Sequence, residues 1–121
     1  MCCMNLKGLS LPIRQFDIWL ADLNPRFGTE PGKVRPVVIV QTDMLNDEHP
    51  STIICPVTSR VQPDAGLLRI RLRDVQLDRP SAVLVDQIRA IDNKRLMSRV
   101  GRLNRSQIIH LKEGIAAILE L

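Results

Sequence analysis

Residues 24–60, NPRFGTEPGKVRPVVIVQTDMLNDEHPSTIICPVTSR, decide the fold of this chain. They open with a loop at 24–33 that contains Gly28 and Gly32. An apolar strand is predicted over 34–41 and a second over 51–57, joined by a short polar linker. If these strands pair in antiparallel fashion, a residue near the start of the first and the residue that follows the second meet at one edge of the sheet.

Those two residues are Arg35 and Thr58. A planar guanidinium can hold two phosphate oxygens, and a hydroxyl can donate to a third. The stretch therefore predicts a small site beside the glycine loop that fits a phosphate.

A strand is also predicted over 16–23, where apolar residues occupy both faces, so this strand should be central or covered on both sides. Further strands are expected at 67–73, 81–88 and 98–103, with helical turns at 42–48 and 92–97. Pro56 indicates an edge position or a bulge in its strand.

Asn104 is expected to begin a C-terminal helix, with Gln107 completing a capping box. The helix carries an apolar stripe of Ile108, Leu111, Ile115, Ile118 and Leu119. Short strands followed by one helix predict a compact, mainly antiparallel α+β barrel.

A formal net charge of +4 comes from 17 basic residues, 13 of which are arginine. This balance favours nucleic acid or another polyanion, although a merely basic protein fits equally well. The three cysteines show no CxxC pair and no zinc spacing, which fits a reducing cytoplasm. Neither a metal nor a cofactor is expected.

The chain is expected to form a single domain over 15–121, preceded by a loosely attached extension at 1–14. No run approaches the roughly 18 apolar residues that a membrane span needs. The extension lacks the apolar region and the cleavage site of a signal peptide.

The chain resembles the MazF/PemK family of toxin endoribonucleases, the mRNA interferases of type II toxin–antitoxin pairs. The resemblance rests on an ordered set of segments that spans nearly the whole domain. These segments are Asp17-Ile18-Trp19, Asp22-Leu23-Asn24-Pro25, Gly28-Thr29-Glu30 with Gly32, Arg35-Pro36-Val37-Val38-Ile39, Cys55-Pro56-Val57-Thr58-Ser59 and Val85-Asp86-Gln87-Ile88-Arg89-Ala90-Ile91-Asp92.

The resemblance implies a small SH3-like (CcdB/PemK-type) antiparallel β-barrel with a C-terminal α-helix. It implies a homodimer that cleaves single-stranded RNA without a metal, leaving 2′,3′-cyclic phosphate and 5′-hydroxyl ends and so inhibiting translation and growth. It also implies a MazE-like antitoxin, which we expect to be acidic because an acidic segment complements a basic groove.

Three positions depart from the family pattern. Phe16 stands where the family usually has glycine, and Thr29 and Pro31 replace two residues of its usual loop. Pro31 stiffens the loop, and this stiffening is expected to affect sequence preference and turnover more than the type of reaction.

Arg35 and Thr58 match the two catalytic positions of the family. Arg35 would stabilise the charge that builds on a phosphate, and Thr58 would donate to a phosphate oxygen. Taken alone, Arg35 could be a structural partner of Asp17 or Asp22, and Thr58 could end its strand by bonding nearby backbone. Glu30 is a third candidate, either as a proton acceptor or as a solvated loop charge.

Candidate RNA contacts lie mainly in the loop and at the strand end. Phe27 could stack on a base, and the backbone at Gly28 could approach a phosphate. The complete set is Arg26, Phe27, Gly28, Thr29, Lys33, Ser59, Arg60, Gln87 and Arg89. Gln87 and Arg89 could instead form a buried network that closes the dimer.

Two other functions remain open. One is a gyrase-poisoning CcdB-like toxin, which binds a protein and would not require the Arg35–Thr58 pair. The other is a non-catalytic nucleic-acid-binding barrel, which fold alone does not separate from an enzyme. A homodimer is also expected because the apolar groups of 16–23 and 81–88 exceed what one small barrel can cover.

Overall fold

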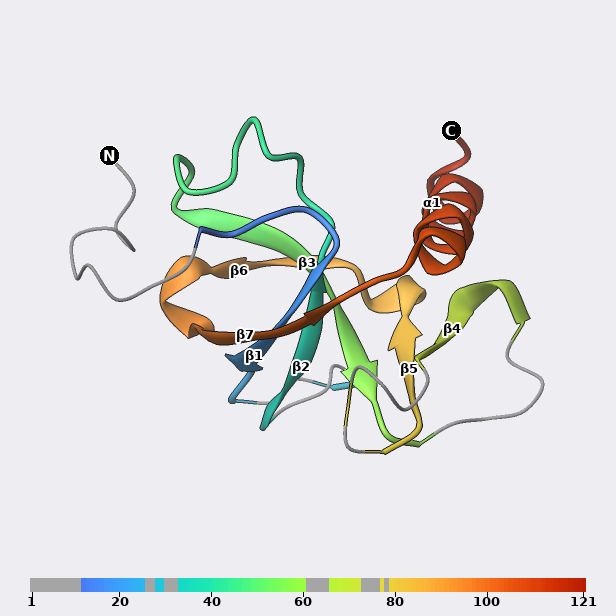
Figure 1. Cartoon of the computed structure of the whole chain (residues 1–121), viewed down its shortest axis with the longest axis horizontal. Helices are drawn as coiled ribbons and strands as arrows, with labels where there is room; N and C mark the ends of the chain where they lie inside the picture. Colours follow the sequence, from blue (N-terminus) through green and yellow to red (C-terminus); the bar gives the residue numbers. More distant parts are fainter. Residues whose placement is uncertain (1–11, 26–27, 30–32, 61–65, 73–76, 78) are drawn as a thin grey trace.

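The structure is a computed structural model that describes residues 12–25, 28–29, 33–60, 66–72, 77 and 79–121. These residues form a seven-stranded antiparallel sheet in the order β4-β5-β3-β2-β1-β7, with β6 paired to β3 off this path. The strands are β1 (Asp17–Asp22), β2 (Val34–Ile39), β3 (Ser51–Thr58), β4 (Arg69–Leu72), β5 (Ser81–Leu84), β6 (Arg89–Asp92) and β7 (Leu96–Arg102). The helix α1 (Arg105–Leu119) follows the last strand and contacts β4 and the turn at 85–87 that follows β5 (Figure 1).

Alternation along the central strands produces two cores, one on each face of the sheet. In β1, Trp19 and Ala21 join one cluster of buried residues and Ile18 joins the other. In β2, Val37 and Ile39 belong to the first cluster and Val38 belongs to the second. The expectation for the first strand is confirmed: it is central, between β2 and β7, and the two core clusters bury both of its faces.

The helix α1 covers the second of these cores. Leu111 is fully buried there, and Ile108, Ile115 and Ile118 pack against it. The predicted capping box is present, because Asn104 Oδ1 accepts from the Gln107 backbone N–H and Gln107 Oε1 accepts from the Asn104 N–H. Leu119, which the apolar stripe placed in the core, is 52% exposed because it stands at the last helical position.

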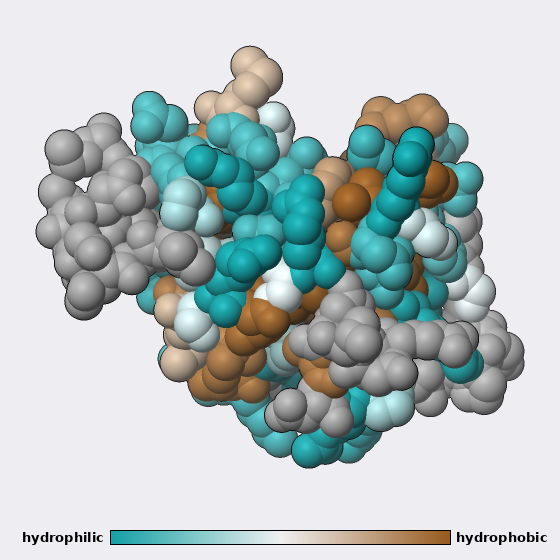
Figure 2. All heavy atoms as spheres, viewed as in Figure 1, coloured by the Kyte–Doolittle hydropathy of each residue, from teal (hydrophilic) through white to brown (hydrophobic). Residues whose placement is uncertain are grey.

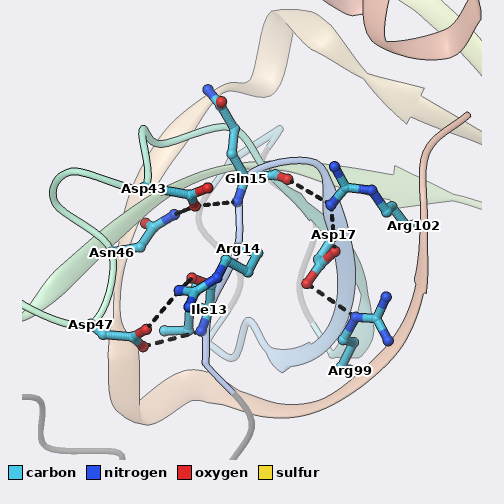
Figure 3. A network of polar contacts seen from close by, with 9 residues as sticks. All are labelled: Ile13, Arg14, Gln15, Asp17, Asp43, Asn46, Asp47, Arg99 and Arg102. Atoms are coloured by element: carbon cyan, nitrogen blue, oxygen red, sulfur yellow. Dashed lines mark hydrogen bonds and ion pairs between the residues drawn. The ribbon is translucent and has the colours of Figure 1, made fainter. Parts of the chain in front are cut away.

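The start of the domain is tied to the loop that follows β2 (Figure 3). Asp47 accepts from the Ile13 backbone and pairs with Arg14, and Asp43 accepts from the Gln15 backbone at 2.7 Å. Ile13, which the sequence assigned to the extension, is fully buried in the core, so the segment from Ile13 onward belongs structurally to the domain.

Asp17, at the start of β1, forms ion pairs with two arginines of β7 (Figure 3). Its side chain is only 4% exposed and binds Arg99 and Arg102, with a nitrogen–oxygen distance of 3.0 Å to each. A buried carboxylate with two cationic partners avoids the large cost of an unpaired buried charge.

The α+β class, the antiparallel sheet and the C-terminal helix are confirmed. The sheet is not closed, since its path ends at β4 and β7 among the described strands, but its curvature is compatible with a barrel (Figure 1). Pro56 does not sit at an edge: it lies in β3 where the pairing passes from β6 at Ile54 to β5 at Val57. No ladder partner is recorded for it on that side, so the missing N–H is tolerated.

Several element boundaries differ from the predictions. The helical turn expected at 42–48 is present, because the Asn46 N–H donates to the Thr42 carbonyl four residues earlier at 3.2 Å, but it does not continue into a longer helix. The strand expected at 67–73 begins with the 3-10 turn η2 (Gly66–Leu68), and the one expected at 81–88 ends in η3 (Val85–Gln87). The turn expected at 92–97 is present as η4 (Asn93–Arg95). No helix in the described part of the chain is long and apolar enough to cross a membrane.

Candidate active site

Pairing of β2 with β3 brings Arg35 and Thr58 together. The antiparallel ladder of β2 and β3 ends with Val37 opposite Pro56, so Arg35 and Thr58 each lie two residues beyond the last pair, on the same side of it. On the other side of β3, Thr58 lies opposite Ala82 of β5. Three adjacent strands therefore meet at this edge, as the antiparallel pairing predicted for the first two of them.

The loop that precedes β2 is closed at its base. The Lys33 N–H donates to Asn24 Oδ1 at 2.7 Å, and the Leu23 N–H donates to the Lys33 carbonyl at 2.9 Å. Arg95 donates from η4 to the carbonyls of Asp22 and Asn24. These bonds hold the loop ends beside the start of β2, next to Arg35.

A cavity of about 570 Å³ opens at this edge, and both Arg35 and Thr58 line it. Its cationic side chains are Lys33, Arg35 and Arg79, and its hydroxyls are those of Thr58, Ser59 and Ser81. Its apolar wall consists of Leu20, Val34, Pro36, Val57, Leu77 and Val100. Figure 2 shows hydrophobic residues reaching the surface over the strands beside β7. Of the apolar wall, Val100 is 38% exposed.

Arg35 is half-buried, and its guanidinium reaches across to β3. Its Nη1 donates to the carbonyl of Val57, with a nitrogen–oxygen distance of 3.4 Å. Of the two suggested structural partners, Asp17 binds Arg99 and Arg102, and Asp22 accepts from the Asn24 backbone N–H. This geometry turns the cation toward the strand end that carries Thr58, where a bound phosphate would meet both groups.

The Thr58 hydroxyl already has one partner. Its oxygen accepts from the Arg60 backbone N–H at 3.1 Å, which is the strand-ending bond that threonine commonly makes. A hydroxyl that accepts one bond still has its proton to donate. The strand-ending bond therefore orients Thr58 and leaves it able to donate into the cavity.

The predicted site residues divide into four groups, of which the last, Gln87 and Arg89, lies away from the cavity. Lys33 and Ser59 line the cavity with Arg35 and Thr58, and Arg60 follows as an exposed neighbour. Gly28 and Thr29 are exposed in the loop, where Gly28 has a φ of 56° that favours glycine. Outside the described residues lie Arg26, Phe27, Glu30, Pro31 and Gly32.

Gln87 and Arg89 do not line this cavity. Arg89 begins β6 and lies opposite Ile54, four residues before Thr58 in β3. At about 3.3 Å per residue, this places it roughly 13 Å along the strand from the site.

Eight lining residues were not among the candidates from the sequence: Leu20, Val34, Pro36, Val57, Leu77, Arg79, Ser81 and Val100. A signal was available for Arg79 and Ser81, because a strand that pairs antiparallel with the strand ending at Thr58 must begin at the same edge. Leu20 and Val100 belong to β1 and β7, whose approach to this edge depends on the curvature of the whole sheet.

The described residues contain no group of three or more His, Cys, Asp or Glu side chains placed to hold a metal ion. The Cys55 thiol is fully buried in β3. Burial, and secondarily the charge of Asp86, raises the pKa of Cys55 to about 12. Cys55 is thus a core residue and not a nucleophile or ligand.

Comparison with known proteins agrees with this architecture. A relative from Staphylococcus epidermidis, described as endoribonuclease MazF, is 36% identical over 111 residues, covering 90% of this chain and 92% of the relative. The crystal structure of MazF (Form-I) from Deinococcus radiodurans has a TM-score of 0.81 at 19% identity, covering 93% of this chain and 100% of that one. The MazE-MazF (Form-III) structure from the same organism has a TM-score of 0.75 at 18% identity, covering 90% and 97%.

The model of one protein family matches residues 14–119, nearly the whole described domain. The match includes the strands that carry Arg35 and Thr58 and the segment that carries Arg79. The chain therefore belongs to the PemK-like, MazF-like toxins of type II toxin–antitoxin systems.

Proposed function

We propose that this protein is an endoribonuclease toxin that cleaves single-stranded RNA in the cytoplasm and thereby inhibits translation. The observation that carries the proposal is the shared cavity of Arg35 and Thr58, on neighbouring strands of a chain with a 36% identical relative described as an endoribonuclease. A gyrase-poisoning toxin or a passive nucleic-acid binder would not require this pairing.

In the proposed reaction, the ribose 2′-hydroxyl attacks the adjoining phosphate in line. The oxygen–phosphorus bond to the next nucleotide breaks, and the products are a 2′,3′-cyclic phosphate and a 5′-hydroxyl. An internal nucleophile already held beside the phosphorus has a large advantage over free water. No metal takes part.

Arg35 would stabilise the negative charge that builds on the pentacoordinate phosphorus, and Thr58 would donate to a non-bridging oxygen. Arg35 cannot serve as the base, because a guanidinium essentially never deprotonates in a protein. Glu30, in the adjoining loop, is the candidate to accept the 2′-hydroxyl proton.

The protein would act as a homodimer. The original reason for this expectation does not hold, because Ile18, Trp19 and Ala21 of β1 are buried within one chain. A different feature supports it: the edge strand β7 exposes Met97 by 56% and Val100 by 38%. A second copy on this strand would cover both side chains and extend the groove that begins at the cavity.

An acidic, MazE-like antitoxin would inhibit the toxin by occupying the basic cavity. The charges of Lys33, Arg35 and Arg79 suit an extended acidic peptide, and a structural relative is a MazE-MazF complex. Co-expression with the acidic open reading frame next to the toxin gene should restore growth. If growth stays arrested with every such neighbour, the proposed pairing fails.

Incubation of the purified protein with a long RNA in excess EDTA tests the enzyme assignment. We expect discrete fragments that end in cyclic phosphates, and Arg35→Ala should form them far more slowly. Intact RNA after incubation without EDTA would contradict the assignment, and cleavage that stops only in EDTA would contradict metal independence.

A further inference from the structure

Arg79 is an exposed arginine on the far side of the cavity from Arg35. It precedes β5, whereas Arg35 belongs to β2, and β3 with Thr58 lies between these two strands. Two inter-strand spacings separate the positions of Arg35 and Arg79 by about 10 Å. Their guanidiniums can therefore face one cavity and bind two different phosphates.

The backbone around Arg79 is held in place. The buried Ser81 hydroxyl donates to the Arg79 carbonyl at 3.0 Å, and Ser81 itself lines the cavity. Two residues before Arg79, Leu77 is half-buried and packs against the core that α1 covers. Anchors on both sides therefore direct this segment toward the cavity.

Arg79 also differs from the arginines that serve the fold. Arg99 and Arg102 bind Asp17, and Arg69 binds Asp86. Among the described residues, no ion pair to Arg79 is recorded. A planar cation with five N–H donors at the mouth of a cavity is suited to a phosphate oxygen.

We propose that Arg79 binds the RNA phosphate next to the scissile one. This inference rests on the proposed function and deepens it: the substrate must carry a second charged linkage beside the bond that is cut. Arg35 and Thr58 would hold the scissile phosphate, Arg79 would hold its neighbour, and the nucleoside between them would cover the apolar wall near Val57 and Leu77.

The test uses the full chain and an RNA oligonucleotide that spans a mapped cleavage site. A single 2′-deoxy sugar at that site keeps the oligonucleotide intact, and fluorescence anisotropy in EDTA measures its affinity. A second set carries one neutral methylphosphonate linkage, placed in turn on either side of the scissile phosphate.

For the wild-type protein, a neutral linkage at one of the two neighbouring positions should weaken binding about tenfold. Arg79→Ala should weaken binding of the all-phosphate oligonucleotide by a similar factor and should show no further loss with the neutral linkage. For Arg79→Ala, the slope of log affinity against log salt concentration should be smaller in magnitude than that of wild type by about 0.7. Arg79→Lys should recover part of the affinity.

Arg14→Ala is the matched control, because Arg14 is a surface arginine tied to the loop after β2, at the opposite end of that strand. It should keep the wild-type affinity, salt slope and methylphosphonate penalty. If Arg79→Ala keeps the penalty, or matches wild type in affinity, this inference is overturned while the proposed function stands. If the wild-type protein cuts no RNA, both are overturned.

Discussion

Phe16 adopts a backbone angle that glycine tolerates better than any other residue. Its φ is 71°, in the left-handed region, at the position where the family usually has glycine. Its N–H donates to the Ile39 carbonyl at 2.6 Å, and its carbonyl accepts from the Leu103 N–H at 3.0 Å. These two hydrogen bonds to neighbouring segments hold the backbone of Phe16 at this φ. The Phe16 ring packs against the core and lies under Lys112, and these contacts offset the strain of the left-handed backbone.

This angle predicts an inverted order of two substitutions. Phe16→Gly and Phe16→Ala both remove the ring, but only alanine keeps a Cβ that the left-handed region disfavours. We expect the glycine variant to be more stable than the alanine variant by about 1 kcal/mol. Urea unfolding of the two proteins measures the difference, and an alanine variant of equal or greater stability would refute this account of the backbone.

Cys55 should be unreactive in the native protein. Burial raises its pKa from 9.0 to about 12, so at pH 8 the reactive thiolate is about a thousandfold rarer than in the unfolded chain. Alkylation with iodoacetamide, followed by peptide mass spectrometry, should label Cys55 only after denaturation. Labelling of Cys55 at the same rate in buffer and in urea would show that the β3 core opens freely.

The residue pair Arg35 and Thr58 could be predicted because it depends on two adjacent strands and an ordered motif. The sequence did not single out Arg79 as a residue of the cavity. Its place depends on β5 pairing with β3, and these strands are more than twenty residues apart in the sequence. Arginines on other strands gave a similar signal, and only the fold separates Arg79 from Arg69, which binds Asp86.

At the scale of elements, the pattern of apolar residues located six of the seven strands but missed β6 (Arg89–Asp92), and it did not fix where the strands end. The segment 81–88 contains the apolar run 82–85, yet it leaves the sheet after Leu84 and turns as η3. The turn carries Val85 into the core that α1 covers. Tertiary packing of this kind overrides a local strand preference, and a single-sequence pattern does not report it.

The helix α1 was the most predictable element because its start has a chemical signature. Gln107 does more than complete the cap, since its Nε2 also donates to the Arg71 carbonyl at 3.2 Å and so joins the helix to β4. The Gln107 side chain therefore both caps the helix and fixes its start against β4.

Asn104→Ala should lower the free energy of unfolding by about 1 kcal/mol, because the Gln107 N–H loses its acceptor. Asn104→Asp keeps an acceptor oxygen at the same place and should remain close to wild type. Chemical denaturation of both variants distinguishes a capping role from a general sensitivity of this turn. Equal losses in the two variants would contradict the capping role.

At the scale of the whole molecule, the exposed apolar side chains of β7 predict a homodimer. Light scattering at micromolar concentration should give twice the mass of one chain. Met97→Glu should shift the protein toward monomer, because a charge would be buried at the interface. Met44→Glu, at an 85% exposed position in the loop after β2, is the control and should stay dimeric. A wild-type monomer, or equal behaviour of the two variants, would contradict this interface.

The central claim is that Arg35 and Thr58 promote attack of the RNA's own 2′-hydroxyl on the adjoining phosphate. The most direct measurement compares two oligonucleotides in EDTA that differ by one oxygen, the 2′-hydroxyl at the cleavage position. The all-ribose strand should be cut to a 2′,3′-cyclic phosphate, about 10²–10³ times more slowly by Arg35→Ala or Thr58→Ala. The 2′-deoxy strand should bind with similar affinity and stay intact. Cleavage of the deoxy strand at the normal rate would contradict the account.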